Sequence, residues 1–359
     1  MIICIIADQI YKSGGIERVL SHRINHWIDE GYQIHLITSQ NDGNEPYFYY
    51  DSRMIHHDIT TSLDTSISLF SRNNLIAASR YFFRLKNALN KIKPEVIIMT
   101  NYSYDYYFLP LIARNAYCIK EYHSSFSEKN NLIEKLKKFY AKFYDSHVFL
   151  SEEEAVLSST PNAVVIPNPI IHSINYPNQM NERKKVILAA GRIVSIKGFE
   201  RLIESWSRIA NKYPEWHLEI YGDGEPSYIK LLKDLIEEKD IAANTNIYPS
   251  TPHINKKMLE SRIYAMSSLS ECFPMVLLEA MCSKMAVIAF DCPTGPRNIL
   301  KDNYNGILVK DNDIINFTKS LERLIKKQDF AQRIADNGYV ESQKYDIRKV
   351  MEKWSSLVN

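Results

Sequence analysis

The feature that most constrains the fold is an apolar run of strand length, a glycine loop and an amphipathic helix that open the chain and return in its second half. The apolar run spans residues 2–7, two adjacent glycines follow, and residues 16–30 place apolar side chains at helical spacing. Gly31 is expected to cap this helix, and residues 33–38 resume as a strand. Strand, helix and strand in this order indicate a βαβ unit with a parallel sheet.

The first half continues with the same alternation. We expect a helix at residues 75–92 and buried strands at residues 95–100 and 147–151. The stretch after VVIPNP (164–169) contains turn formers but no sustained periodicity, which suits a hinge between two domains. A chain of 359 residues is about twice the usual single-domain size, so the length also favours two domains.

A second sheet is predicted after the hinge. The expected strands are 186–191, 217–222, 263–267, 286–290 and 306–309, and the expected helices are 199–213, 228–239, 276–282 and several within 313–357. The fold class is therefore α/β, with two doubly wound, Rossmann-like domains. We place them at residues 1–170 and 171–340, and expect a C-terminal helix at 341–359 to pack back toward the first domain. Such sheets bind ligands at the carboxyl ends of their strands.

Composition excludes several other classes. A net charge of +2, from 44 Lys and Arg against 42 Asp and Glu, is too small to imply a nucleic-acid binder. The longest apolar runs fall far short of the roughly 20 residues that a membrane span needs. The opening MIICIIADQ has no basic region before a short apolar core, so we expect a buried strand in a cytoplasmic protein. Five cysteines without C-x-x-C spacing argue against a disulfide framework and a zinc site.

One candidate site follows the first strand of the second half. Gly191 and Arg192 end that strand, and Lys197 and Gly198 open the next helix. Fixed positive charge and backbone amides at a helix N-terminus would stabilise a diphosphate. The alternative for these residues alone is a turn with a surface arginine.

A pair of carboxylates marks a second element of the candidate site. Glu271 falls in a loop after a strand, and Glu279 lies eight positions later, inside the following helix. The amides around residues 273–276 lie at the N-terminal end of that helix, which attracts anions. A carboxylate further along the helix could accept two ribose hydroxyls, and one at its mouth could bind a sugar hydroxyl. The alternative is a solvated Glu279 and a capping Glu271.

Taken together, these residues resemble the retaining glycosyltransferases of family four, which have the GT-B fold. The resemblance runs over nearly the whole chain. It rests on SGGIERVL (13–20), EYHSSF (121–126), VFLSEEE (148–154), VIPNPI (165–170), AAGRIVSIKGFERLIES (189–205), LEIYGDGE (218–225) and SECFPMVLLEAM (270–281). It implies that the first domain binds the acceptor and that the second holds a sugar nucleotide, usually a UDP-sugar.

The resemblance also implies roles for residues of the second domain. Arg192 and Lys197 would contact the diphosphate, Glu279 the ribose and Glu271 the donor sugar. The nucleotide-binding loop would comprise Phe273, Pro274, Met275 and Val276. We expect no metal and no separate cofactor, because charge that grows on the leaving phosphate would be met by cations and amide donors.

Two first-domain residues and two departures complete the implied site. The Gly15 backbone would approach the phosphate, and His123 would orient a sugar hydroxyl. For a lone histidine, the alternative is a structural role. Lys284 stands where the family often has glycine, and Asn298 stands where it often has an acid. The second departure, at Asn298, puts acceptor or sugar contacts in doubt.

Two stretches combine basic and aromatic residues. The first, residues 65–94, has six Lys or Arg and no acid, and the second, residues 132–144, has four Lys beside four aromatic residues. Anionic headgroups attract such cations, so these stretches predict a peripheral position on the inner face of the cell membrane. The alternative is an ordinary amphipathic helix with its aromatics packed inward. Nucleic acid explains the pattern less well, since no binding module is recognisable.

The resulting expectation is an enzyme that moves a hexose or N-acetylhexosamine from a UDP-sugar to a glycan acceptor that is linked to a polyprenyl diphosphate or belongs to a surface polysaccharide. Galactose, N-acetylgalactosamine and glucose are all open for the transferred sugar. The rivals are a UDP-sugar 2-epimerase on the same fold and a non-catalytic glycan-binding or regulatory subunit. The glycine loop and the arrangement of Glu271 and Glu279 favour transfer over the epimerase. The non-catalytic subunit is disfavoured by the joint presence of Gly15, Arg192, Lys197, Glu271 and Glu279.

Overall fold

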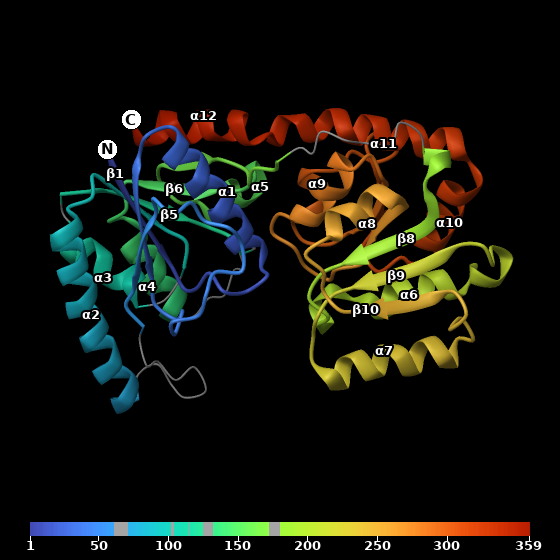
Figure 1. The fold of residues 1–359 in the computed structure, drawn as a ribbon, viewed down its shortest axis with the longest axis horizontal. Helices are drawn as coiled ribbons and strands as arrows, with labels where there is room; N and C mark the ends of the chain where they lie inside the picture. Colours follow the sequence, from blue (N-terminus) through green and yellow to red (C-terminus); the bar gives the residue numbers. More distant parts are fainter. Residues whose placement is uncertain (61–70, 102–103, 114, 125–131, 172–179) are drawn as a thin grey trace. The chain divides into compact units, whose positions relative to one another are not determined.

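The computed structural model describes residues 1–60, 71–101, 104–113, 115–124, 132–171 and 180–359. The chain forms two compact units, coloured from blue to red along the sequence in Figure 1. The first comprises Met1–Pro169 together with Ile347–Asn359, and the second comprises Ile170–Asp346. The units meet in sequence at Pro169, and the last helix of the chain belongs to the first unit.

The first unit contains a seven-stranded parallel sheet. Its strands are β1 (Ile2–Ala7), β2 (Gln33–Thr38), β3 (Ile55–Asp58), β4 (Val96–Met99), β5 (Tyr117–Glu121), β6 (Ser146–Phe149) and β7 (Ala163–Val165). They lie in the order β3-β2-β1-β4-β5-β6-β7, and Ile5 is in register with Leu36 on one side and Ile98 on the other. The order reverses between β1 and β4, which is the position where doubly wound sheets bind ligands.

Helices cover both faces of this sheet. They are α1 (Gly15–Asp29), α2 (Arg72–Ile92), α3 (Asp105–Ile112), α4 (Leu132–Ala141), α5 (Glu152–Ser158) and α12 (Ile347–Val358). Apolar side chains of α1 and α12 pack on one face of the sheet, and those of α2 and α3 pack on the other. Gly31 follows α1 with a φ of +88°, so the expected glycine cap is confirmed.

The last helix of the chain completes the core of the first unit. In α12, Met351 and Trp354 are fully or almost fully buried among apolar residues of α1 and the sheet. The Trp27 and Trp354 rings meet edge to face, with centroids 5.7 Å apart. Figure 1 accordingly shows α12 beside α1, with both chain ends in this unit.

The second unit contains a six-stranded parallel sheet. Its strands are β8 (Lys184–Ala190), β9 (His217–Tyr221), β10 (Thr245–Tyr248), β11 (Ser261–Met266), β12 (Ala286–Asp291) and β13 (Ile307–Lys310). Their order is β10-β9-β8-β11-β12-β13, so the order reverses between β8 and β11. Both sheets are thus doubly wound, as expected from the alternation of strands and helices.

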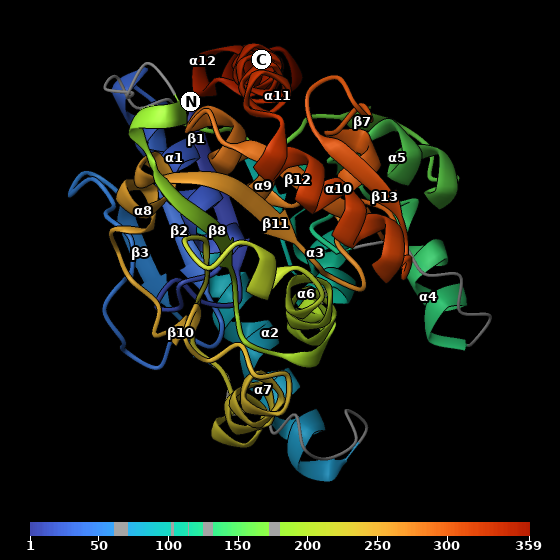
Figure 2. The same ribbon diagram turned by 90° about the vertical axis from the view of Figure 1, so that its right-hand side faces the viewer.

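The described residues of the second unit form six α-helices. They are α6 (Phe199–Ser207), α7 (Pro226–Glu238), α8 (Ile254–Glu260), α9 (Met275–Cys282), α10 (Ile314–Lys326) and α11 (Gln328–Ser342). α6 and α10 pack side by side (Figure 2), and Thr318 of α10 donates a hydrogen bond to the carbonyl of Ser205. The Phe290 and Phe317 rings stack with centroids 4.2 Å apart, so α10 is tied to β12 as well.

One predicted helix is shorter than expected. The periodicity predicts a helix at residues 199–213, but α6 ends at Ser207 and the chain continues as a 3₁₀ turn at Ala210–Lys212. Pro214 disfavours helical geometry at Tyr213, and bonds from Lys212 to Ile209 and from Tyr213 to Ala210 tighten the chain instead. Within the described residues, no helix is both long and apolar enough to cross a bilayer.

Candidate active site

The candidate site of the second unit is built from loops at the point where its strand order reverses. Residues 191–198 connect β8 to α6, and residues 267–274 connect β11 to α9. β8 and β11 are neighbours in the sheet, so these two loops leave the same edge side by side. This is the position at which a doubly wound sheet holds its ligand.

Close backbone contacts lock these two loops together. The Leu269 amide donates to the carbonyl of Ile196 over 2.8 Å, and the Ser267 hydroxyl donates to the carbonyl of Lys197 over 3.1 Å. Gly198 has a φ of +58°, and a Cβ added there would lie 2.4 Å from the carbonyl oxygen of Ser267. Glycine is therefore required at this position both by its backbone conformation and by the close approach of the second loop.

The contact between the loops ends in an ion pair. Nζ of Lys197 lies 2.6 Å from Oε1 of Glu271, and the two side chains are 21% and 13% exposed. The Ser268 hydroxyl donates to the same carboxylate oxygen over 2.6 Å. The cation expected for the diphosphate and the carboxylate expected for the sugar therefore lie against each other, and both are accessible from solvent.

A third loop fixes the backbone of Glu271. The amides of Thr294 and Gly295 both donate to the Glu271 carbonyl over 2.8 Å, and the Glu271 amide donates to Pro293 over 2.9 Å. A Cβ at Gly295 would lie 2.5 Å from Cδ of Pro274. The loop after β12 thus packs tightly beneath the loop that contains Glu271, and it holds that residue in place.

Helix α9 begins where the Glu271 loop ends. Its first residue is Met275, so the expected amide cluster at residues 273–276 lies at its N-terminus. Pro274 has no N–H, hence donors in this cluster come only from Phe273, Met275 and Val276. Glu279 is 9% exposed and lies in the second turn of α9, so it is a buried carboxylate rather than a solvated helix residue.

The remaining cation of the candidate site is more open. Arg192 lies two residues after the end of β8, and it is exposed. A small hollow between the loops brings together Lys197, Glu271 and Val276. Its complete lining is Ala190, Lys197, Phe199, Tyr264, Ala265, Met266, Ser267, Ser268, Glu271 and Val276.

Ser268 and Tyr264 line this hollow, and neither was predicted as a site residue. Ser268 stands three positions before Glu271 and donates to its carboxylate, a contact within the loop that no sequence pattern singled out. Tyr264 lies inside β11, and its hydroxyl donates to the Ala190 carbonyl over 3.1 Å. Burial raises the pKa of Tyr264 above its ordinary value, so this phenol is a hydrogen-bond donor beneath the site. Nothing in the apolar strand sequence singled out this tyrosine.

Gly15 and His123 belong to the first unit. Gly15 begins α1, and a Cβ added there would have no heavy atom within 4 Å, so the space beside its backbone is open. His123 follows β5, and its side chain is 5% exposed. Nε2 of His123 lies 3.1 Å from Oε1 of Glu121. Residues 125 and 126 of the EYHSSF motif lie outside the described residues.

The two departures from the family pattern have structural correlates. Lys284 adopts a φ of +52°, which is the conformation that a glycine would adopt at lower cost. Asn298 lies in a 3₁₀ turn after β12, where its side-chain amide donates to the Thr294 carbonyl over 2.9 Å. At Lys284 the chain thus accepts backbone strain where glycine is common.

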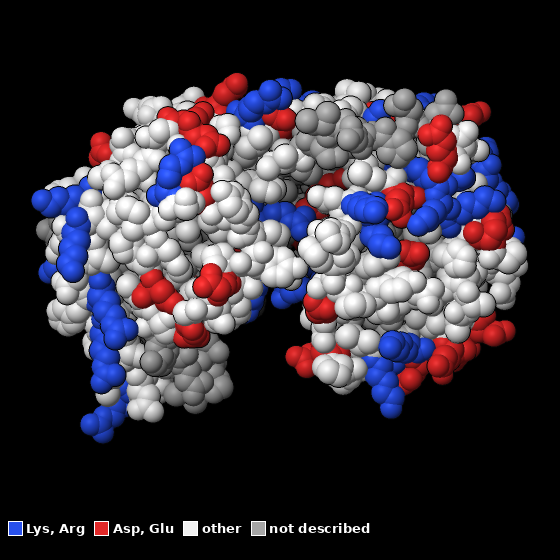
Figure 3. Space-filling model, viewed as in Figure 1, with Lys and Arg blue, Asp and Glu red and all other residues white. Residues whose placement is uncertain are grey.

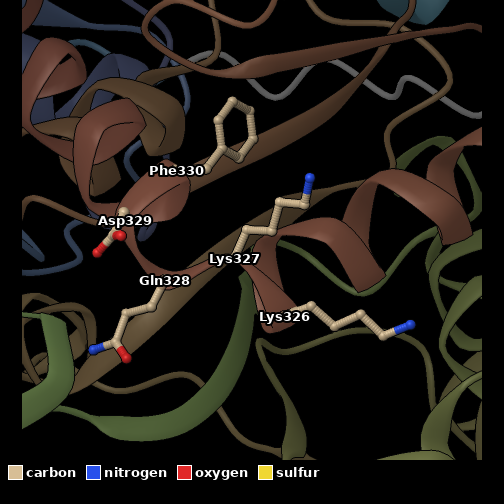
Figure 4. Close-up of a pocket in the computed structure, with 5 residues that line it drawn as sticks. All are labelled: Lys326, Lys327, Gln328, Asp329 and Phe330. Carbon is tan, nitrogen blue, oxygen red and sulfur yellow. The ribbon is translucent and has the colours of Figure 1, made fainter.

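Another hollow lies at the junction of α10 and α11. Figure 4 shows its lining, Lys326, Lys327, Gln328, Asp329 and Phe330. The polar ends of these side chains point away from one another, and all come from a single stretch of chain. This hollow therefore gathers no set of chemical groups that a substrate would require.

Comparisons with known proteins agree with this geometry. The family model "Glycosyl transferases group 1" matches residues 173–341. An uncharacterized glycosyltransferase of Haemophilus influenzae is 29% identical over 97% of both chains. The amylovoran biosynthesis glycosyltransferase AmsD of Erwinia amylovora is 27% identical over 99% of both chains. A structure of a TarM mutant of S. aureus with fondaparinux, alpha-GlcNAc-glycerol and UDP covers 100% of this chain and 99% of its own, with a TM-score of 0.79 at 16% identity.

Two doubly wound units, together with the similarity to the TarM structure, define the GT-B fold. The protein is a glycosyltransferase. More specifically, the family model of the group 1 glycosyltransferases matches a segment that lies within the second unit. The family segment contains the loops around Lys197, Glu271 and Glu279.

The close approach at Gly198 generates a stability prediction. Changing Gly198 to Ala should lower the free energy of unfolding of the second unit by at least roughly 2 kcal/mol, because it adds a clash to a left-handed backbone conformation. Denaturant unfolding measures this loss. As a control, Gly15→Ala should cost nothing, since its Cβ meets open space and alanine favours a helix. Equal stability of the two variants would contradict the tight contact between the loops.

Proposed function

We propose that the protein is a retaining glycosyltransferase that moves a hexose or N-acetylhexosamine from a UDP-sugar to a hydroxyl of a lipid-linked or surface-polysaccharide glycan. The observation that carries this proposal is the placement of Lys197 and Glu271, in contact with each other, at the reversal point of the second sheet. A cation suited to a diphosphate and a carboxylate suited to a sugar then lie within hydrogen-bonding distance of each other, beside the N-terminus of α9.

The proposed chemistry follows from how charge moves. The bond between the anomeric carbon and the diphosphate oxygen breaks, the acceptor oxygen bonds to the same face of the sugar, and its proton passes to the departing phosphate. Negative charge grows on that phosphate, and Lys197, Arg192 and the amides at the start of α9 stabilise it. Glu279 accepts hydrogen bonds from the ribose, and His123 orients a hydroxyl of the donor sugar. These protein groups meet the developing charge, so the proposal includes neither a metal nor a further cofactor.

The names of similar proteins support the choice of substrates. TarM was crystallised with UDP and with a sugar attached to glycerol, and AmsD is named for the biosynthesis of amylovoran. One further relative is named for transfer to a saccharide on undecaprenol diphosphate. A UDP-sugar donor and a polyprenyl-diphosphate-linked glycan acceptor are therefore the substrates that we propose here.

A direct assay tests this function. The protein is incubated with UDP-galactose, UDP-N-acetylgalactosamine or UDP-glucose, with and without a polyprenyl-diphosphate-linked saccharide. We expect one donor to release UDP only when the acceptor is present, and proton NMR of the product to show the same anomeric configuration as the donor. Interconversion of the sugar nucleotide without acceptor would instead indicate the epimerase. An inverted product would contradict retention.

Calorimetry with UDP separates the roles of three residues. Lys197→Ala and Glu279→Ala should each weaken UDP binding by roughly tenfold, because one removes a charge-assisted contact and the other leaves ribose hydroxyls unpaired. Glu271→Ala should keep or increase UDP affinity, since it frees Lys197 from its ion pair, while turnover of the intact UDP-sugar falls by about tenfold or more.

Ser268→Ala is the matched control for Glu271→Ala. It removes the second hydrogen bond to the carboxylate but keeps the carboxylate itself, so it should lower turnover less than Glu271→Ala does. Equal losses of UDP affinity in Glu271→Ala and Glu279→Ala would reverse or abolish these assignments.

We also propose that the first unit works at the cytoplasmic face of an anionic membrane. The supporting features are two basic aromatic stretches, one on α2 and one on α4 and the residues that follow it. Their exposed basic residues include Arg72, Arg80, Arg84, Lys86, Lys135, Lys138 and Lys142, and their exposed apolar residues include Leu75, Ile76, Phe83, Leu136, Phe139 and Phe143. Figure 3 shows Lys and Arg gathered in a column over α2.

Inward packing explains only part of these two stretches. Tyr81 and Tyr144 are buried, and Phe82 contacts Phe108, as an ordinary amphipathic helix would require. Phe83 and Phe139, in contrast, are 61% and 53% exposed beside the basic residues. Exposed aromatic rings between cations are suited to the boundary between lipid headgroups and acyl chains.

Liposome cosedimentation tests this position. Vesicles that contain anionic lipid should bind the protein at low salt and release it as ionic strength rises, since screening shortens the electrostatic reach to about 8 Å at physiological salt. Changing Lys135, Lys138, Lys142, Arg80 and Lys86 to Gln should weaken binding and leave UDP affinity intact. The control changes Lys230, Lys233 and Lys319, which are exposed on the second unit, to Gln. Binding that ignores lipid charge, or that falls equally in the control, would overturn the proposal.

A further inference from the structure

A buried ion pair lies next to His123 in the first unit. Both terminal guanidinium nitrogens of Arg23 donate to Glu121, Nη1 over 2.8 Å to Oε1 and Nη2 over 2.7 Å to Oε2. The two side chains are each 1% exposed. Burying two charges costs free energy, and a bidentate pair recovers it only when the geometry holds both groups in one position. This pair therefore fixes the Glu121 carboxylate rigidly at the end of β5.

His123 lies against this fixed carboxylate. Its Nε2 is 3.1 Å from Oε1 of Glu121, which is the oxygen that also accepts from Arg23. This nitrogen is buried and, although it lies within ion-pair distance of Glu121, it forms no hydrogen bond of standard geometry with any described residue. Burial raises the pKa of Glu121, but Arg23 and His123 outweigh burial and hold this pKa well below its usual range. An ionised carboxylate only accepts hydrogen bonds, so it favours a proton on Nε2.

The C-terminal helix reaches the other side of this pair. The Arg23 guanidinium carbon lies 4.4 Å from the ring centroid of Trp354 in α12 and 5.3 Å from that of Trp27. Cations over aromatic faces are attracted to them, and the two rings also exclude water from the guanidinium. Contacts thus run without a gap from Trp354 through Arg23 and Glu121 to His123.

We propose that Glu121 is a positioning residue for His123. Arg23 holds Glu121, and the Glu121 carboxylate keeps the Nε2–H of the imidazole toward its own oxygen. Nδ1 is then left as a hydrogen-bond acceptor for a hydroxyl of the donor sugar. The contact with that hydroxyl rests on the proposed function. Orientation of an imidazole by a carboxylate on its opposite nitrogen is a general way to select a tautomer. Glu121 then acts on transfer only through His123.

A double-mutant cycle distinguishes positioning from a structural role. Replacing both charges, in Arg23→Met with Glu121→Leu, removes the pair without leaving one charge buried alone. We expect kcat to fall at least tenfold while UDP affinity stays within twofold. Adding these two changes to His123→Ala should cause no further loss of kcat, because the pair acts through the missing imidazole. Losses that multiply would overturn the proposal.

Tyr144→Phe is the control for loss of a buried polar contact in the same unit. Its hydroxyl donates to the Tyr106 carbonyl over 2.8 Å, and it has no described contact with Glu121 or His123. We expect its kcat to match the unchanged protein. Thermal unfolding of every variant identifies any that fail to fold, and a folded pair variant with wild-type kcat would contradict the positioning role.

Nitrogen NMR tests the arrangement independently of activity. In protein labelled with ¹⁵N-histidine, with the His123 signals assigned from His123→Ala, the neutral ring should show a proton on Nε2, and the pair variant should shift toward a mixture of tautomers. A proton on Nδ1 in the unchanged protein would overturn the proposal. If no UDP-sugar is turned over, the proposed function fails, while these spectra still decide whether Glu121 positions His123.

Discussion

The carboxyl ends of parallel strands lie along one edge of a sheet, and the candidate site in each unit depends on this constraint. In the second unit, β8, β11 and β12 end beside one another, so their loops meet and share backbone hydrogen bonds. Lys197 and Glu271 are 74 positions apart in the sequence, yet their side chains touch. In the first unit the same constraint places Gly15 after β1 and His123 after β5.

The ion pair of Lys197 with Glu271 and that of Arg23 with Glu121 differ in burial, and the difference suits their proposed tasks. Lys197 and Glu271 are partly exposed, so an incoming anion can compete for the lysine without a large change in desolvation. Arg23 and Glu121 are almost completely buried, and separating them would leave two unpaired charges away from water. The exposed pair can rearrange around a substrate, whereas the buried pair serves as a fixed support.

The sequence predicted the parts of the fold whose side chains are apolar and regularly spaced. The two doubly wound sheets followed from apolar runs and glycine loops, and the GT-B fold followed from the resemblance to the family-four glycosyltransferases; the structure confirms both. Edge strands such as β3 (IHHD) and β10 (TNIY) were missed because they are short and partly polar, so they show no apolar run. The early end of α6 depends on Pro214, whose effect on the preceding residue outweighed the apolar periodicity.

Side-chain partners were less predictable than the loops that contain them. The loops with Lys197 and Glu271 were identified, but not their direct contact, because it depends on the register between β8 and β11. The Arg23 and Glu121 pair joins residues 98 positions apart, and a basic residue inside an amphipathic helix gives no sign that it will be buried.

The return of α12 to the first unit affects the order in which the protein can fold during synthesis. When residue 169 has been made, the N-terminal sheet still lacks Val350, Met351, Trp354 and Val358 of its apolar core. At typical ribosome speeds the remaining chain takes about 10–40 s to appear, and the second unit is completed within that interval. The unit that is translated first is therefore finished last, and its unfilled core is exposed to chaperones and to aggregation until the final helix emerges.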